Sequence, residues 1–407
     1  MDKNGKNLDD LQDLNRSSVI RHLAMHEGCS RVELAKVTGL KQASITKIMR
    51  ALVENGVVAE TGFTEGLKGR RSIGLSLNYS KYMVIGVKVA WERLSIGVFD
   101  LCGRVYGDIF TCSFDYLDLA NAESAVALIA QYVEKFKARH PGVIAVGVAA
   151  PGPLHRGEGS VYVTADGREG RVYFPFLKKI RERVALPVVI DHDANAGALG
   201  YWWFRTNCDA RMALLYLLAS EGIGGGVVSK GQIITGQRGH SAEMGHMIVE
   251  FGGRKCVCGG RGCLDAYASS IAVEKRAHRV LPEHPGSALA GKGRVGVADV
   301  FSAMRRGDEV AVGLVREAGV HMGRGFASLI PIFDPDLIVI GDLMAYGGDV
   351  LLAGIDEVLG RSLSRFYKKP RIVLADPGDD LVLLGSAAIA IDYAYSHPTE
   401  LLMPGVS

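Results

Sequence analysis

The chain has 407 residues, of which 48% are hydrophobic and 22% charged, enough for globular cores in two or three domains. No apolar run approaches the ~18 residues of a membrane-spanning helix, and the first ten residues lack an apolar signal core, so we expect a cytoplasmic protein. The net charge of +3 lies entirely in residues 1–80, which hold 12 Lys and Arg against 9 Asp and Glu. This imbalance weakly favours a nucleic-acid partner for that segment.

Three helical patterns follow one another in the first 56 residues. They are predicted over residues 15–28, 30–39 and 42–55 from the spacing of apolar positions and from the glycines that end them. The second helix opens with a capping box, in which Ser30 and Glu33 satisfy each other's backbone amides.

The spacing of the second and third helices is typical of a helix-turn-helix. Ala35 is small where two helices cross, Gly39 suits a left-handed turn, and Ile45 anchors the third helix from behind. The opposite face carries side chains that read DNA grooves and contact phosphates: Lys41, Gln42, Ser44, Thr46, Lys47 and Arg50. The alternative is a solvated polar face on a small helical bundle.

A β-hairpin wing is predicted after the third helix. Two apolar stretches, at residues 57–59 and 73–77, flank a basic turn. Its cations, Lys68, Arg70 and Arg71, are placed to reach a phosphate backbone or a minor groove. Residues 1–78 are therefore predicted to form a winged helix-turn-helix that binds DNA.

From residue 82 on, strands and helices alternate, which is the pattern of an α/β fold. Strands are predicted at residues 83–89, 94–100, 105–112, 143–149, 186–190, 213–218, 227–229 and 337–340, and helices at 124–139 and about 384–397. Residues 151–153, 193–195 and 220–226 read as loops next to these strands, where open sheets bind their ligands.

One short stretch carries the ligand types of a tetrahedral zinc site. His246 is followed, after nine residues, by Cys256, Cys258 and Cys263, with glycines between them that let the backbone wrap around an ion. Scattered buried thiols are the alternative, but three cysteines within eight residues argue against it. The other four cysteines are widely spaced, as in a reducing compartment. We predict a structural Zn²⁺ ion.

These segments together resemble the ROK family, which joins sugar-dependent repressors and sugar kinases on an actin-like ATPase fold. The matching segments are Pro151–Pro153, Asp193–Ala196, Gly222–Gly226, Glu243–His246 and Cys256–Leu264, and the winged helix that ends in Gly69–Asn78 resembles the repressor subgroup. The resemblance implies an α+β multidomain protein, a winged helix-turn-helix (1–78) followed by a two-lobed α/β body. The first lobe is expected at 82–196, with the helix at about 384–397 returning to it, and the second at 197–383 with the zinc motif.

The resemblance also allows a residue-by-residue comparison with the family's kinases. Asp193 matches their catalytic carboxylate. Their first strand carries an Asp and then a Gly-Gly-Thr turn close to the ATP phosphates, whereas this chain has Lys88, then Ala90, Trp91 and Glu92. Side chains in place of glycines keep the backbone from approaching a phosphate, and Lys88 removes the acid that positions the metal.

Two further loops carry carboxylates near the expected nucleotide. Glu221 stands where the family usually has Thr, and Asp342 follows Gly341 near the expected adenosine position. Like charges ~4 Å apart repel by ~4 kcal/mol at an effective dielectric near 20. We therefore expect a degenerate ATP site and no enzymatic activity. The alternative, an active ROK sugar kinase fused to a DNA-binding head, would keep nucleotide affinity.

By resemblance, the sugar-binding residues are His192, Asp193, Glu243, His246 and Asp265, with His246 sharing its two ring nitrogens between zinc and sugar. The family usually has Asn where this chain has His192, and Glu where it has Asp265, so the identity of the sugar is open. His192 is alternatively a core histidine with its hydrogen bonds satisfied.

The expected function is a sugar-responsive, DNA-binding transcriptional regulator, a repressor of genes for carbohydrate uptake or metabolism. Its expected partners are double-stranded DNA with a palindromic operator, a sugar or sugar-phosphate effector, and a second copy in a homodimer or dimer of dimers. A transport-system protein is a further candidate partner. The sequence does not identify the sugar or the operator, and it does not decide between repression and activation.

Overall fold

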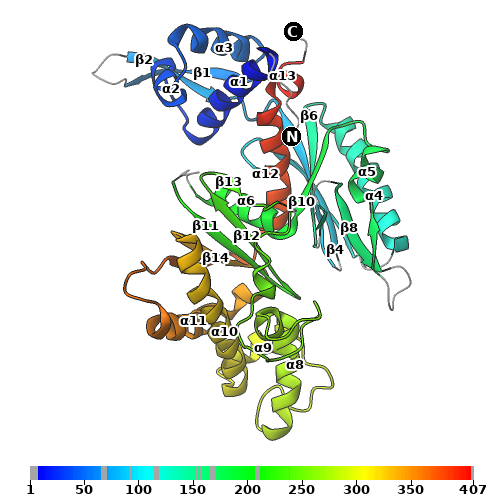
Figure 1. Cartoon of the computed structure of the whole chain (residues 1–407). Helices are drawn as coiled ribbons and strands as arrows, with labels where there is room; N and C mark the ends of the chain where they lie inside the picture. Colours follow the sequence, from blue (N-terminus) through cyan, green and yellow to red (C-terminus); the bar gives the residue numbers. More distant parts are fainter. Residues whose placement is uncertain are drawn as a thin grey trace. The chain divides into compact units, whose positions relative to one another are not determined.

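The computed structural model describes residues 8–65, 71–91, 93–113, 119–152, 154–155, 158–164, 171–206, 211–237 and 239–404 (Figure 1). The chain divides into two compact units. Unit 1 comprises residues 1–191, 203–208 and 383–407, and unit 2 comprises 192–202 and 209–382. In the part of the chain that is described, no helix combines the length and the apolar character needed to cross a bilayer.

The N-terminal part of unit 1 is a winged helix. Its elements are α1 (Leu8–Met25), α2 (Arg31–Thr38), α3 (Gln42–Glu54) and the antiparallel strands β1 (Val58–Glu65) and β2 (Arg71–Leu77). The predicted capping box is present, because Glu33 accepts from the Ser30 amide at 2.8 Å and the Ser30 hydroxyl accepts from the Glu33 amide. Gly39 ends α2 with a φ of 71°. The turn between α2 and α3 is thus the one that the sequence predicts.

Helix α1 begins earlier than the sequence predicts. It starts by Leu8, so that residue 15 lies in its interior. Two features favour the longer helix. Asp10 lies in its first turn, where the helix dipole stabilises an acid. Asp13, in the part of the helix that the sequence missed, also accepts a hydrogen bond from the Thr399 hydroxyl, a partner 386 residues away that local patterns do not reveal.

The rest of unit 1 is an α/β lobe around a five-stranded sheet with strand order β10-β6-β3-β4-β5. Its elements are β3 (Met83–Val89), β4 (Arg93–Asp100), β5 (Phe110–Ser113), α4 (Leu119–Arg139), β6 (Val143–Ala150), β7 (Leu154–His155), β8 (Ser160–Thr164), β9 (Arg171–Phe174), α5 (Phe176–Arg181) and β10 (Val188–His192). Strand β3 pairs antiparallel with β4 and parallel with β6, while β7, β8 and β9 form a separate small sheet.

The C-terminal helix α12 (Leu381–Ser396) packs on this sheet and is followed by α13 (Pro398–Leu401). A Cβ on Gly86 of β3 would lie 2.6 Å from the Ser386 hydroxyl, and one on Gly147 of β6 would overlap the Ser386 carbonyl. Only glycine therefore lets helix and sheet approach this closely.

Unit 2 holds a second five-stranded sheet, with strand order β13-β12-β11-β14-β15. Its elements are β11 (Leu214–Ala219), β12 (Ile223–Ser229), β13 (Gln232–Ile233), η1 (Met244–His246), α7 (Asp265–Ala268), α8 (Ser270–Val280), η2 (Leu281–Glu283), α9 (Val297–Arg305), α10 (Glu309–Phe333), β14 (Leu337–Gly341), η3 (Leu343–Gly347), α11 (Gly348–Ser362) and β15 (Arg371–Leu374). Helix α6 (Asp193–Arg205) follows β10 and begins in this unit.

Helices α10 and α11 lie against each other along a seam of glycines. A Cβ on Gly319 would overlap the backbone of Leu351, and a Cβ on Gly354 would overlap the carbonyl of Arg316. Leu351 and Phe326 are fully buried in the core that these helices share with the sheet. Helix α10 is therefore a rigid support for the segments that pack on it.

Two predictions about strands were wrong. Residues 223–226, predicted as loop, belong to β12 and pair with β11. A run of glycines is usual for a loop, but here a Cβ on Gly226 would meet Ala198 at 2.7 Å, so the glycines serve close packing. The strand predicted over 105–112 is only Phe110–Ser113, with an isolated bridge between Phe99 and Val105.

Candidate functional site

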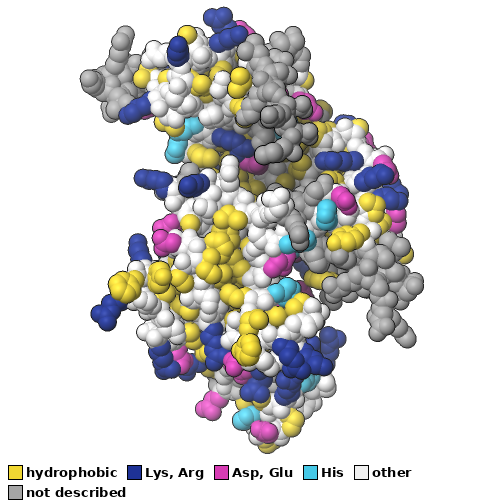
Figure 2. Space-filling view, in the orientation of Figure 1, with side chains coloured by type: hydrophobic (Ala, Val, Ile, Leu, Met, Phe, Trp, Pro, Cys, Tyr) yellow, Lys and Arg dark blue, Asp and Glu magenta, His cyan; other side chains and the backbone are white. Residues whose placement is uncertain are grey.

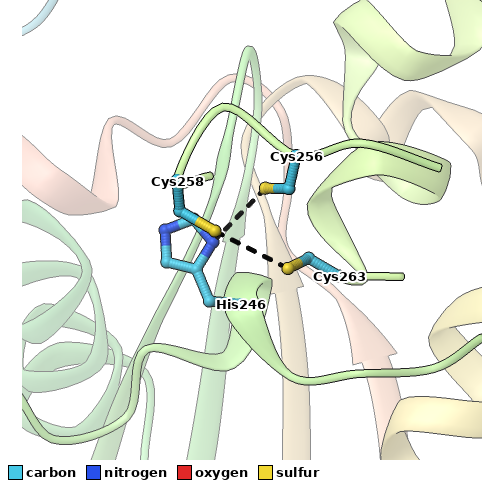
Figure 3. Close-up of side chains that lie close together, drawn as sticks. All are labelled: His246, Cys256, Cys258 and Cys263. Carbon is cyan, nitrogen blue, oxygen red and sulfur yellow. Dashed lines mark hydrogen bonds between the residues drawn. The ribbon is translucent and has the colours of Figure 1, made fainter. Parts of the chain in front are cut away.

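Four metal-ligand side chains converge in unit 2 (Figure 3). His246 ends η1, and Cys256, Cys258 and Cys263 come from the loop that follows. Their ligand atoms all lie within 4.8 Å of one another. His246 Nδ1 is 3.7 Å from Cys256 Sγ, and Cys258 Sγ is 3.7 Å from Cys263 Sγ. This grouping could hold a metal ion.

The loop around this cluster is shaped by glycines, as the sequence predicts. Gly259 and Gly262 have φ angles of 90° and 81°, in the left-handed region. A Cβ on Gly262 would also overlap the carbonyl oxygen of Glu250. The Cys256 amide donates to the Gly260 carbonyl at 2.9 Å, which closes the turn between the ligands.

The thiols are in different electrostatic environments. Burial raises the pKa of Cys263 to about 12 and also raises that of Cys256. A hydrogen bond from the Gly260 amide lowers the pKa of Cys258. Metal ions bind thiolates, so a bound cation would have to displace protons from the two buried thiols. Three sulfurs and one imidazole nitrogen are a donor set that fits a soft divalent ion.

Two of the candidate sugar-binding residues, His192 and Asp265, lie close to the start of β12. A Cβ on Gly224 would lie 3.5 Å from His192 Cε1, and a Cβ on Gly222 would lie 3.4 Å from Asp265 Oδ1. The same Asp265 oxygen accepts a 2.8 Å hydrogen bond from the Ile223 amide. His192 and Asp265 therefore both lie beside the start of β12.

His192 and Asp193 stand where β10 turns into α6. His192 Nδ1 lies 3.2 Å from Asp193 Oδ1, and both side chains are about 16% exposed. The Ala194 amide donates to Asp193 Oδ1 at 2.7 Å. The carboxylate thus lies at a helix N-terminus, where the dipole favours a negative charge. His192 accepts a hydrogen bond from the Ala194 amide, as expected for a core histidine whose hydrogen bonds are satisfied. Its ring also contacts the carboxylate of Asp193, which matches the catalytic base of the family's kinases.

Glu243 and His246 share one short turn. Glu243 is half-buried, and its carbonyl accepts from the His246 amide at 3.0 Å. Ala242, directly before it, has a φ of 61°, a strained backbone for a residue with a Cβ. A Cβ on Gly245 would overlap the Ile223 carbonyl, so this turn lies directly on β12. Burial raises the pKa of Asp265, against the opposing hydrogen bond from the Ile223 amide. No pattern in the sequence predicts the strained backbone at Ala242.

In unit 2, the hydroxyl of Ser220 lies near both of the carboxylates that are expected to repel a nucleotide. The Ser220 hydroxyl lies 2.7 Å from Glu221 Oε2 and 3.4 Å from Asp342 Oδ1. Asp342 has φ 64° and ψ −151°, and it accepts from the Leu343 amide at 2.8 Å. Burial and three nearby aspartates raise the pKa of Tyr216 well above its usual range. This edge of the sheet therefore carries concentrated negative charge.

The turn between β3 and β4 in unit 1 is tight and lacks glycine. The Ala90 amide donates to the Arg93 carbonyl at 2.8 Å, and Trp91 is 37% exposed. Lys88 is half-buried near the end of β3, and Glu92 lies outside the described residues. The backbone that approaches the phosphates in the family's kinases carries side chains here.

The polar face of α3 is exposed as predicted. Ile45, Met49 and Leu52 are fully buried, which turns the opposite face outward. The exposed candidates are Lys41, Gln42, Ser44, Thr46, Lys47 and Arg50. Figure 2 shows Lys and Arg side chains along the outer edge of the winged helix, over α3. Arg71 begins β2, whereas Lys68 and Arg70, like Pro153 of the family motif, lie outside the described residues.

An N-terminal winged helix-turn-helix followed by a two-lobed α/β body of actin-like ATPase type is the fold class that these elements define. Residues 120–393 match the model of the ROK family, and the chain belongs to this family. The chain is 26% identical over 400 residues to the xylose repressor of Caldicellulosiruptor bescii, covering 95% of this chain and 98% of that protein.

Solved structures that share the fold include a regulator and a kinase. One is described as a ROK family transcriptional regulator, a homolog of the Escherichia coli MLC protein; its TM-score is 0.82 at 24% identity, covering 97% of this chain and 98% of the other. The other is the ROK hexokinase from Thermus thermophilus, with a TM-score of 0.63 at 30% identity, covering 76% of this chain and 97% of the hexokinase. The regulator thus matches nearly the whole chain, and the kinase about three quarters of it.

Proposed function

We propose that this protein is a sugar-responsive, DNA-binding transcriptional regulator, a repressor of genes for carbohydrate uptake or metabolism. The observation that carries this proposal is a winged helix with an exposed polar recognition face, joined in one chain to a body of sugar-kinase fold. The match to a xylose repressor along 95% of the chain supports it. Its proposed location is the cytoplasm, where a bacterial regulator such as that repressor meets DNA.

DNA recognition is assigned to the exposed face of α3 and to the wing. Lys47 and Arg50 suit phosphate contacts, and Gln42 and Ser44 suit contacts to base edges in the major groove. A homodimer or a dimer of dimers would present two such helices to a palindromic operator, with half-sites spaced by whole helical turns.

Sugar recognition is assigned to His192, Asp193, Glu243, His246 and Asp265. Their support is the contact of both His192 and Asp265 with the start of β12, and of the Glu243–His246 turn with Ile223. Carboxylates accept charge-assisted hydrogen bonds from vicinal hydroxyls. A sugar, or a sugar phosphate, shifts the protein toward the conformation that it binds better, and only that difference in affinity can change DNA binding.

The metal is proposed to be a structural Zn²⁺ held by His246, Cys256, Cys258 and Cys263. Since His246 faces the cysteine sulfurs through Nδ1, its Nε2 is left to hydrogen-bond a sugar hydroxyl. Zinc would keep Glu243 and Asp265, at the two ends of the segment, in register.

The protein is proposed to lack kinase activity, because Glu221 and Asp342 concentrate negative charge next to Ser220. The second candidate function is ATP-dependent hexose phosphorylation. The similarity to a hexokinase and the place of Asp193 at the start of α6 favour it. A transport-system protein remains a further proposed partner.

A gel-shift titration tests the proposal. The full chain is titrated against operator-like palindromes upstream of sugar genes, with and without a panel of pentoses, hexoses and their phosphates. We expect at least one sugar to change the DNA affinity severalfold. Binding that no sugar changes would contradict the proposal. Magnesium-dependent phosphate transfer from ATP to a hexose, lost in Asp193→Asn, would favour the kinase instead.

A further inference from the structure

Arg254 connects the metal loop (residues 247–263) to two helices of unit 2. It lies two residues before the ligand Cys256. Its Nη2 donates to Glu317 Oε1 of α10 at 3.0 Å, and its Nη1 donates to the carbonyl of Ala266 in α7 at 3.3 Å. Its guanidinium carbon lies 4.4 Å from the centroid of the Tyr267 ring. One side chain therefore makes a charged, a polar and an aromatic contact.

The backbone of Arg254 joins the two ligand-bearing arms of the loop. Its amide donates to the Tyr267 hydroxyl at 2.7 Å, and its carbonyl accepts from the Gly262 amide at 2.8 Å. A Cβ on Gly253 would overlap the Tyr267 hydroxyl, so the loop lies directly on this ring. Cys256 and Cys263 are thus fixed relative to each other by a residue that is not a ligand.

Glu317 is the fixed end of this network. Its second carboxylate oxygen accepts from Arg276 Nε of α8 at 3.0 Å, and its side chain is 31% exposed. Burial alone would raise the pKa of Glu317, but the two arginines outweigh it and hold the pKa below its usual range. The carboxylate is therefore ionised at neutral pH, and it lies on the helix that the glycine seam packs rigidly against α11.

Helix α7 needs such an anchor, because it spans only Asp265–Ala268. A single helical turn does not hold its own conformation in water. Its first residue is Asp265, which contacts Ile223, and its second residue, Ala266, accepts from Arg254. The direction of the Asp265 carboxylate therefore depends on contacts from outside the turn.

We propose that Arg254 and Glu317 are positioning residues, which hold the metal loop and α7 against α10 and so set both the metal affinity of the cluster and the orientation of Asp265. This inference rests on the proposed zinc and sugar sites. It assigns part of the affinity for zinc and for sugar to the ion pair of Arg254 and Glu317, which belongs to neither proposed set of binding residues. Groups that hydrogen-bond the ligating side chains typically change metal affinity 10- to 100-fold, and because Arg254 and Glu317 act one contact further out, we expect the lower end of that range.

The chain offers a matched control on the same helix. Arg316, next to Glu317, donates from Nη2 to Glu357 of α11 at 2.8 Å. Glu357 is 29% exposed, against 31% for Glu317, but it has no contact with the metal loop among those found in the described part of the chain. Exposed ion pairs contribute little to stability. Glu357→Gln therefore measures the general cost of removing a carboxylate from these helices.

The experiment uses the full chain loaded with Zn²⁺ and compares Glu317→Gln, Arg254→Lys and Glu357→Gln. Zinc release to an excess of a chromophoric chelator is timed, and hydrogen–deuterium exchange is measured over residues 254–268. We expect Glu317→Gln to release zinc about tenfold faster and to lose amide protection in this segment. Arg254→Lys, which keeps the charge, should be intermediate, and Glu357→Gln unchanged within about twofold.

The proposal is overturned if Glu317→Gln and Glu357→Gln release zinc equally fast, or if release only follows the loss in melting temperature across the three variants. If the wild-type chain binds no Zn²⁺, the metal assignment itself fails. The exchange comparison then decides the inference: unchanged protection over 262–268 in Glu317→Gln overturns it, and increased exchange there, absent from Glu357→Gln, supports it.

Discussion

His246 faces the sulfur of Cys256 through Nδ1, at 3.7 Å. An imidazole that gives one nitrogen to a metal keeps the other for a second partner. His246 also ends the turn that begins at Glu243 and lies on β12. The candidate metal cluster and the candidate sugar site therefore share a side chain, and a change in one is expected to alter the other.

Replacing Cys258 with Ser should release the metal and destabilise unit 2 by several kcal/mol, because metal binding is coupled to folding. Metal content by mass spectrometry and thermal unfolding measure this. Cys102→Ser, a change at a half-buried cysteine of unit 1, is the control for removing a thiol. An unchanged metal content and melting temperature in Cys258→Ser would refute the zinc assignment.

Lys47→Ala should weaken binding to all DNA sequences alike and reduce the slope of log K against log salt by about one, since a phosphate contact is lost. Lys47 is exposed on α3. Fluorescence anisotropy at several salt concentrations measures both effects. Arg139→Ala, at the exposed end of α4, removes the same charge from another surface. Equal losses in the two variants would argue against a DNA contact at Lys47.

Asp193→Asn should lower the affinity for the effector sugar by roughly 10- to 100-fold, the effect of losing a charge-assisted hydrogen bond of about 1.5–3 kcal/mol. DNA affinity without sugar should stay the same, because Asp193 lies in unit 2 and the winged helix in unit 1. Gel shifts with increasing sugar measure both quantities. A sugar response identical to wild type would remove Asp193 from the proposed site.

Glu221→Thr combined with Asp342→Gly should raise the affinity for Mg-ATP above that of the wild type, because two carboxylates near one hydroxyl are removed. Asp342→Gly should be tolerated, since φ 64° and ψ −151° suit glycine. Calorimetric titration measures the change, with Asp376→Gly as a control for a carboxylate elsewhere in unit 2. An unchanged affinity would mean that charge repulsion is not the obstacle.

The free energy of unfolding should fall as the solution becomes mildly acidic, in part because of His321. Burial, followed by the charge of Arg324, lowers the pKa of His321 from 6.5 to about 4. The unfolded chain therefore gains a proton near pH 6.5 that the folded chain gains only near pH 4. The stability that neutral His321 contributes is complete above pH 6.5 and is lost as the pH falls toward 4.

His321→Phe tests this dependence. The new ring keeps the contact with Tyr267, whose centroid lies 4.3 Å from that of His321, and the lost Nδ1 has no hydrogen-bond partner among the described residues. The decline in melting temperature between pH 6.5 and 4 should become shallower than in wild type. The exposed His284→Gln should leave the slope as it is. A slope unchanged in His321→Phe would contradict the buried neutral imidazole.

The sequence by itself determined the features that depend on nearby residues. The Ser30–Glu33 capping box, the turn at Gly39, the buried face of α3 and the four ligands within eighteen residues all follow from spacings of a few positions. Most strands were also predictable, because buried strands are short apolar runs. The first part of helix α1 was missed, and Asp13 in that part contacts Thr399 from the far end of the chain.

The tertiary structure decided what depends on close approach between distant segments. It turned Gly-rich residues 223–226 into strand, because Ala194 and Ala198 pack against that backbone. It brought Ser220 close to Asp342, and Arg254 into contact with Glu317, across 122 and 63 positions of sequence. No regular spacing in the sequence predicts contacts between residues this far apart. They form only because the sheet and the seam of α10 and α11 bring their backbones together.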